Sequence, residues 1–200
     1  MIETEDFEHE HGIEDDEEDE HHHSEKYDTH IWLDLSIAAK LVRNIENAIS
    51  EYDSNNSFQY RSNAEKYVSE LNLLDYEISD VVKNGRTKMI AFGGPFAYAY
   101  FIERYGLDFI SAYDSCGENG EPSVFKVKEV IDYIKKNNLN VIFYKELSSG
   151  SIAKTISEET GAEMLEFNSL HTVTDKELEN DVSYISIMRK NLDNLKKALN

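Results

Sequence analysis

Cysteine, proline and tryptophan are scarce in this chain of 200 residues, which has one cysteine, two prolines and one tryptophan. The single cysteine, Cys116, excludes an internal disulfide and a thiolate-rich metal site. Bases are also few, with 20 Lys and Arg against 40 Asp and Glu, a net charge of −20. That balance excludes a usual nucleic-acid binder or a basic membrane-surface module, because phosphates would be repelled. No apolar run approaches the length that spans a bilayer.

The negative charge is concentrated in the first 30 residues, which hold 14 acids and one base, a net of −13. Seven consecutive acids, residues 14–20, repel one another and bury nothing, so residues 1–26 are predicted to form a disordered arm. The same arm carries five histidines: His9, His11, His21, His22 and His23. Neutral imidazoles among carboxylates suit zinc, which favours an accessory arm that collects metal loosely. The alternative is an acidic tail that only aids solubility.

Two long helices are predicted next. Apolar residues recur every four positions from Ile37 to Ile49, which predicts a helix over about 36–52. A second series from Tyr60 to Ile78 predicts a helix over about 58–84, roughly 40 Å long. Gly85 is expected to end this helix in a left-handed conformation.

The rest of the chain alternates between short apolar runs and helical patterns. Strands are predicted at 88–92, 107–113, 140–144 and 163–167, and helices at 96–105, from Ser123 onward, at 149–160 and at 176–199. This order predicts an α/β fold with a mainly parallel four-stranded sheet that is flanked by helices. Ligands of such folds bind beyond the carboxyl ends of the strands.

Common catalytic motifs are absent from the sequence. It has no G-x-G-x-x-G, no P-loop and no G-x-S-x-G. Ser148, Ser149 and Ser151 lie near Glu146 in sequence, but only His171 is available as a base in the body of the chain. We therefore expect no enzyme, and a small α/β hydrolase is kept as the alternative from another class.

Several stretches together resemble one family, the ZnuA/TroA-like zinc and manganese receptors of ABC transporters. The histidine-rich acidic arm stands directly before Asp28-Thr29-His30-Ile31-Trp32-Leu33-Asp34, which is similar to the family's D-P-H-I-W-L-D motif. Further similar stretches follow in the family's order at 44–49, 60–75, 97–107, 121–123, 141–143, 153–161 and 184–195. The resemblance covers essentially the whole chain, and the order and spacing of the stretches are more specific than any one of them.

The resemblance implies two α/β lobes that are joined by a long helix, with the metal in the cleft between them. It divides the chain into the arm, a remnant of the first lobe at 27–57, the connecting helix at 58–85 and the second lobe at 86–200. His30 matches the motif's metal-binding histidine, whereas the second-lobe ligand position falls on Pro95, which has no donor atom. The acidic ligand position falls on Asn168, a weak ligand, and His171 is a further weak candidate.

The resemblance thus implies a component of a zinc (or manganese) ABC importer that captures a divalent ion and delivers it to a membrane permease. It implies an extracytoplasmic, membrane-associated location, although the chain as given shows no signal peptide, which leaves a cytoplasmic location as the alternative. One alternative is a degenerate fragment that buffers metal weakly through its arm. Another is a separate chain that supplies the first lobe, for which an exposed apolar face on the 36–52 helix would be the sign.

Overall fold

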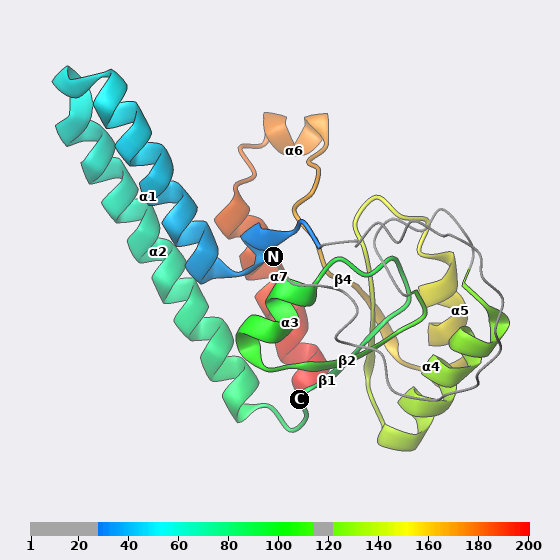
Figure 1. The fold of residues 1–200 in the computed structure, drawn as a ribbon. Coiled ribbons are helices and arrows are strands. Elements are labelled where there is room, and N and C mark those ends of the chain that lie inside the picture. Colours follow the sequence, from blue (N-terminus) through cyan, green and yellow to red (C-terminus); the bar gives the residue numbers. More distant parts are fainter. Residues whose placement is uncertain (1–27, 114–121) are drawn as a thin grey trace, which may run out of the picture.

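The computed structural model describes residues 28–113 and 122–200, whose arrangement is shown in Figure 1. The arm predicted at residues 1–26, with its five histidines, lies outside the described residues, and so does Cys116. Of the helices in the described ranges, none is both long enough and apolar enough to cross a membrane.

A helical hairpin comes first and projects away from the sheet (Figure 1). A 3-10 turn, η2 (Ile31–Leu33), leads into α1 (Leu35–Tyr52), and a second turn, η3 (Ser54–Asn56), leads into α2 (Ser57–Asn84). Asp34 begins α1 as its N-cap, because its Oδ1 accepts hydrogen bonds from the backbone N–H groups of Ser36 (2.7 Å) and Ile37 (3.3 Å). Both long helices predicted from the apolar spacing are confirmed to within a residue.

The α/β part confirms the predicted fold class. Four parallel strands lie in the order β2-β1-β3-β4: β1 (Met89–Phe92), β2 (Asp108–Ser111), β3 (Val141–Tyr144) and β4 (Glu163–Glu166). The helices of this part are α3 (Ala99–Tyr105), α4 (Val124–Asn137), α5 (Ser151–Thr160), α6 (Asp175–Glu179) and α7 (Tyr184–Leu199).

Each face of the sheet has its own core, because successive side chains of a strand point to opposite faces. Ile90 and Phe92 of β1 point into a core shared with α2, α3 and α7. Ala91 of β1 and Ile142 of β3 point into a smaller core shared with α4 and α5. The carboxyl ends of the strands therefore lie at one edge of a sheet that is covered on both faces.

Two predicted helix ends are wrong. Gly85 is not left-handed but extended (φ −64°, ψ 151°), because the chain turns directly toward β1 and the Arg86 N–H donates to the Leu199 carbonyl (2.7 Å). The helix predicted over 96–105 begins only at Ala99, since Phe96 and Tyr98 enter the aromatic core in non-helical conformation.

The single helix predicted over 176–199 is also wrong, because it is two helices, α6 and α7. Each begins with its own capping box, in which Thr174 pairs with Glu177 and Ser183 pairs with Ser186. Asp181, between them, has a positive φ of 52°, which a continuous helix does not allow. The reciprocal side-chain-to-backbone hydrogen bonds at Thr174 and Ser183 favour the start of two separate helices over one long helix.

The exposed apolar face expected on the first helix is present. Ile45 and Ile49 of α1 keep 59% and 41% of their surface exposed, although they continue the apolar spacing that predicts the helix. With Val42, Tyr60 and other residues of α1 and α2 they line an open groove of about 400 Å³. No other described segment packs on this apolar face.

Candidate metal centre

Two histidines from distant parts of the sequence meet at the carboxyl edge of the sheet. His30 lies just before η2, and His171 lies in the loop that leads from β4 to α6. Their nitrogens, His30 Nε2 and His171 Nδ1, are 3.2 Å apart although the residues are 141 positions apart in sequence. His30 is buried, with 4% of its surface exposed, whereas His171 is open to solvent.

The distance between these nitrogens suits a shared zinc ion. Two nitrogens that each lie about 2.05 Å from a tetrahedral zinc are about 3.3 Å apart. Without metal, the same distance is a hydrogen bond between the two rings. Since one ring is exposed and the other is buried, an ion from solvent reaches the pair from the side of His171.

Asp28 fixes the orientation and the protonation of the His30 ring. Its Oδ1 accepts hydrogen bonds from the backbone N–H of His30 (2.8 Å) and from the ring Nδ1 (2.7 Å). An ionised carboxylate only accepts, so Nδ1 carries the proton and the Nε2 lone pair faces His171. Burial raises the pKa of Asp28, but the hydrogen bonds from His30 outweigh it and leave that pKa below its ordinary value. This carboxylate–histidine arrangement is typical of zinc ligands.

The loop that carries the second histidine is held by buried polar side chains. Glu146, just after β3, accepts the backbone N–H (2.7 Å) and the hydroxyl (2.5 Å) of Ser169. Asn191 of α7 pairs with both backbone groups of Asn168 at 2.8 Å. Leu170 has a positive φ of 55°, and its N–H is accepted by the Asn168 side chain. Such a loop has little freedom to move just before the histidine.

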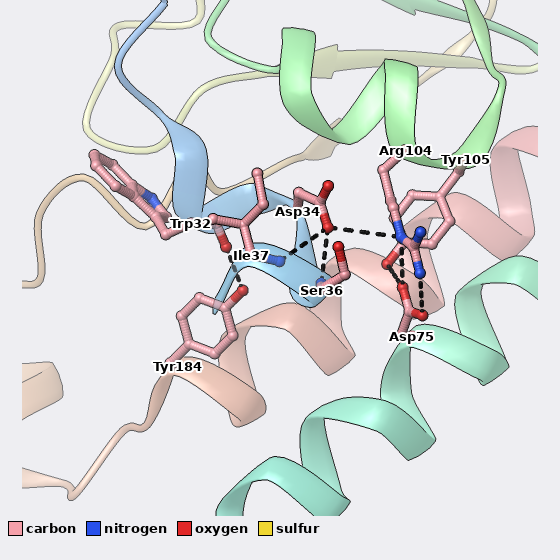
Figure 2. Close-up of polar contacts among 8 residues, drawn as sticks. All are labelled: Trp32, Asp34, Ser36, Ile37, Asp75, Arg104, Tyr105 and Tyr184. Carbon is pink, nitrogen blue, oxygen red and sulfur yellow. Dashed lines mark hydrogen bonds and ion pairs between the residues drawn. The ribbon is translucent and has the colours of Figure 1, made fainter. Parts of the chain in front are cut away.

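The segment that carries His30 is held by the contacts drawn in Figure 2. The Tyr184 hydroxyl of α7 donates to the backbone carbonyl of Trp32 (2.5 Å). The Arg104 guanidinium of α3 binds both carboxylate oxygens of Asp75 on α2 (2.6 and 3.1 Å) and lies 3.6 Å from Asp34. Burial, reinforced by nearby negative charge from Asp34, raises the pKa of Tyr184, so its hydroxyl remains a donor at neutral pH. Three helices thus anchor the turn between His30 and α1.

A comparison with known families assigns the chain to one of them. The ZnuA family, described as "Zinc-uptake complex component A periplasmic", matches residues 2–198. The chain belongs to the ZnuA family. The high-affinity zinc uptake system protein ZnuA of Bacillus subtilis is 32% identical over 176 residues, which are 88% of this chain and 54% of that protein. The zinc-binding lipoprotein AdcA of Streptococcus pneumoniae is 31% identical over 196 residues, which are 98% of this chain and 37% of that protein.

Solved structures of ZnuA-like proteins have the same fold. The metal-dependent lipoprotein YcdH of Bacillus subtilis superposes with a TM-score of 0.75 at 31% identity, over 86% of this chain and 65% of that one. The Zn(II)-bound ZnuA-like domain of Streptococcus pneumoniae AdcA superposes with a TM-score of 0.72 at 29% identity, over 86% of this chain and 64% of that one. The chain therefore spans about half of the first of these curated relatives and about two thirds of each solved chain.

The three predicted ligand residues have different surroundings in the structure. His30 and His171 lie together, whereas the side-chain oxygen of Asn168 accepts the Leu170 N–H and shapes the loop. Within residues 28–113 and 122–200, no group of three or more His, Cys, Asp or Glu side chains is placed to hold a metal ion. The described residues thus offer a pair of imidazoles and not a complete set of metal ligands.

Sequence reasoning overlooked the roles of Asp28 and Trp32. A carboxylate two residues before a candidate ligand histidine was a usable signal for Asp28, because a turn of that length brings it to the ring. The indole N–H of Trp32 donates to the backbone carbonyl of Ser169 in the β4–α6 loop (2.9 Å), and this contact between distant residues had no local signal. The serines of the hydrolase alternative make local hydrogen bonds instead of pairing with a base: the Ser148 hydroxyl donates to the Lys145 carbonyl, and the Ser149 hydroxyl donates to the Ser151 hydroxyl.

Proposed function

We propose that this chain is the metal-binding part of a zinc receptor for an ABC importer, and that it captures a divalent ion and hands it to a membrane permease. Membership of the ZnuA family supports the class of function. The observation that carries the proposal is the 3.2 Å approach of His30 Nε2 to His171 Nδ1, with Asp28 behind His30. The ion is cargo, so no bond is made or broken.

Zinc is the ion that this pair favours. Imidazole nitrogens suit zinc, whereas magnesium and calcium prefer cages of oxygen, and manganese is bound more weakly by the same donors. Two histidines occupy two of about four positions around zinc, so the others fall to water or to groups outside the described residues. We propose His30 and His171 as the ligands, with Asn168 shaping the loop and the arm histidines as an accessory site.

The groove between α1 and α2 supports a two-lobed arrangement. Ile45 and Ile49 remain exposed there, and the chain covers only 65% of the YcdH structure. Apolar surface of this kind marks an interface. We propose that the remaining part of the family fold packs on this groove, whether further residues of the same polypeptide or a second chain supply it. Residues 27–57 would then belong to the first lobe, 58–85 to the connecting helix and 86–200 to the second lobe.

The family description also supports a location outside the cytoplasm. The family is described as periplasmic, and one relative is a lipoprotein. We propose that the receptor acts at the outer side of the membrane beside its permease, where the acidic arm raises the local concentration of cations.

Zinc titration by calorimetry tests the proposal. It is run on the full chain, on a variant whose five arm histidines are replaced by asparagine, and on that variant with His30→Ala or His171→Ala. We expect the arm variant to keep one site, and we expect either histidine substitution to weaken zinc binding at that site strongly without abolishing it. Equal binding after both substitutions would contradict the proposed site. Loss of all binding with the arm histidines would favour the weak metal buffer instead.

A further inference from the structure

The two proposed ligands lie on segments that the sheet does not join. His30 precedes η2 and the hairpin, whereas His171 follows β4. A zinc ion needs their nitrogens about 3.3 Å apart. The hydrogen bond between the two rings would be replaced when zinc binds, so a contact outside the pair is needed to keep the two segments at this separation.

Trp32 makes that contact with both segments. Its indole N–H donates to the backbone carbonyl of Ser169, two residues before His171, at 2.9 Å. Its ring lies edge-on to both imidazoles, with centroid distances of 5.2 Å to His30 and 6.1 Å to His171. It is the one tryptophan of the chain, and it touches both members of the pair.

Both ends of this cross-link are firmly held. At one end, Glu146 accepts both the N–H and the hydroxyl of Ser169, which is fully buried. At the other end, the Tyr184 hydroxyl donates to the backbone carbonyl of Trp32 (Figure 2). Because Trp32 and Ser169 are both held in place, the hydrogen bond between them fixes the distance between their two segments. A hydrogen bond between two mobile segments would not fix that distance.

We propose that Trp32, held by Tyr184, is a positioning residue that sets the separation of the two zinc-binding histidines. The inference rests on the proposed function, since it concerns the same site. A tryptophan kept only for packing would need its rings but not the indole N–H. Trp32→Phe keeps an aromatic ring and removes that donor, so it separates the two roles.

The test measures zinc affinity by calorimetry in the full chain with the arm histidines replaced. We expect Trp32→Phe to lower the affinity about tenfold, as loss of an outer-shell partner does. Asn194→Ala is the matched control: it also removes a side-chain N–H that donates to a backbone carbonyl, that of Glu166 (2.7 Å), but it leaves the loop untouched. We expect the control to cost similar thermal stability and to leave zinc affinity unchanged.

A double-mutant cycle separates positioning from general weakening. In a His171→Ala background, Trp32→Phe should no longer change the residual zinc affinity, because there is no second histidine to place. An equal loss in both backgrounds would overturn the inference, and so would unchanged affinity in the Trp32→Phe chain. If Trp32→Phe does not fold, Tyr184→Phe takes its place with the same expectations.

A fluorescence titration of the wild-type chain adds an independent measurement. The emission of Trp32 should change with zinc and reach saturation at the concentration that calorimetry gives. If calorimetry detects the site but the Trp32 emission does not change with zinc, the inference about Trp32 would be overturned while the proposed function would stand. Zinc binding that neither His30→Ala nor His171→Ala alters would overturn the proposed function and this inference together.

Discussion

Replacing Asp28 with asparagine removes the negative charge behind His30, and with it the charge that the Ala99 backbone also stabilises. A single atom, Asp28 Oδ1, accepts both the backbone N–H and the ring N–H of His30. An asparagine oxygen in the same place accepts the same two bonds, so the geometry is kept. What is lost is the negative charge, which makes such hydrogen bonds roughly twice as strong as neutral ones.

The expected effect follows from those two bonds. An outer-shell carboxylate of a metal-binding histidine contributes about 10- to 100-fold to affinity. Since Asp28→Asn keeps both hydrogen bonds, we expect the lower end, about tenfold or about 1.4 kcal/mol. The free energy of unfolding should fall by about 1 kcal/mol at neutral pH, because two charge-assisted bonds become neutral ones.

The pH dependence of that stability difference has a definite sign. The pKa of Asp28 in the folded chain lies below its reference value of 3.8. The carboxylate therefore stabilises the fold fully above about pH 4, and this contribution disappears as the pH falls through the folded pKa. The wild-type chain and Asp28→Asn should converge in stability at strongly acidic pH.

Calorimetric zinc titration at pH 7 and denaturant unfolding across the acidic range check these expectations. Asp53→Asn is the matched control, because Asp53 also accepts two hydrogen bonds, from Asn56 (2.8 Å) and Tyr60 (2.7 Å), at the far end of α1. Its zinc affinity should equal that of the wild-type chain. Equal zinc affinity of Asp28→Asn and wild type would refute the reasoning that a charged partner prepares His30 for zinc.

Three further predictions concern zinc binding, packing and the groove. Zinc affinity should fall as the pH is lowered, because protons compete with zinc for imidazole nitrogens, and titrations at several pH values measure this. Gly93→Ala should cost about 1–3 kcal/mol in denaturant unfolding, because the new Cβ would lie 2.6 Å from Ala153 Cα; an unchanged midpoint would contradict that contact. Ile45→Ser should leave the stability of this chain within about 0.5 kcal/mol, whereas Leu74→Ala in the core should cost about 2–5 kcal/mol. A comparable loss at Ile45 would mean that the groove is already filled.

The elements of the fold could be predicted well where their signals are local. The spacing of apolar residues in α1 and α2 reports which positions share a helix face, and that is a property of neighbouring residues. The short β-branched and aromatic runs of the strands are local in the same sense. The break between α6 and α7 also had a local signal, in the capping boxes that begin at Thr174 and Ser183. Sequence reasoning missed it because the apolar spacing continues across the break.

Helix ends that depend on distant partners could not be predicted from local signals. Gly85 follows a helix, which favours a left-handed cap, yet the carbonyl of Leu199 at the other end of the chain binds the next N–H and leads the chain straight on. Ala99 begins α3 late because the aromatic core takes the residues before it. In both places a tertiary contact outweighs the local preference.

The candidate site also has some features with local sequence signals and others that depend on tertiary contacts. The sequence by itself determined the family and most of the helix–strand order, and it singled out His30 as a candidate, because each of these is carried by residues close together in the chain. Only the tertiary structure showed that His171 lies beside His30, that Asp28 binds the His30 ring, and that the Trp32 indole binds the loop before His171. The physical reason is that the approach of two segments 141 residues apart depends on how the whole sheet and its helices pack, and no local pattern encodes that distance.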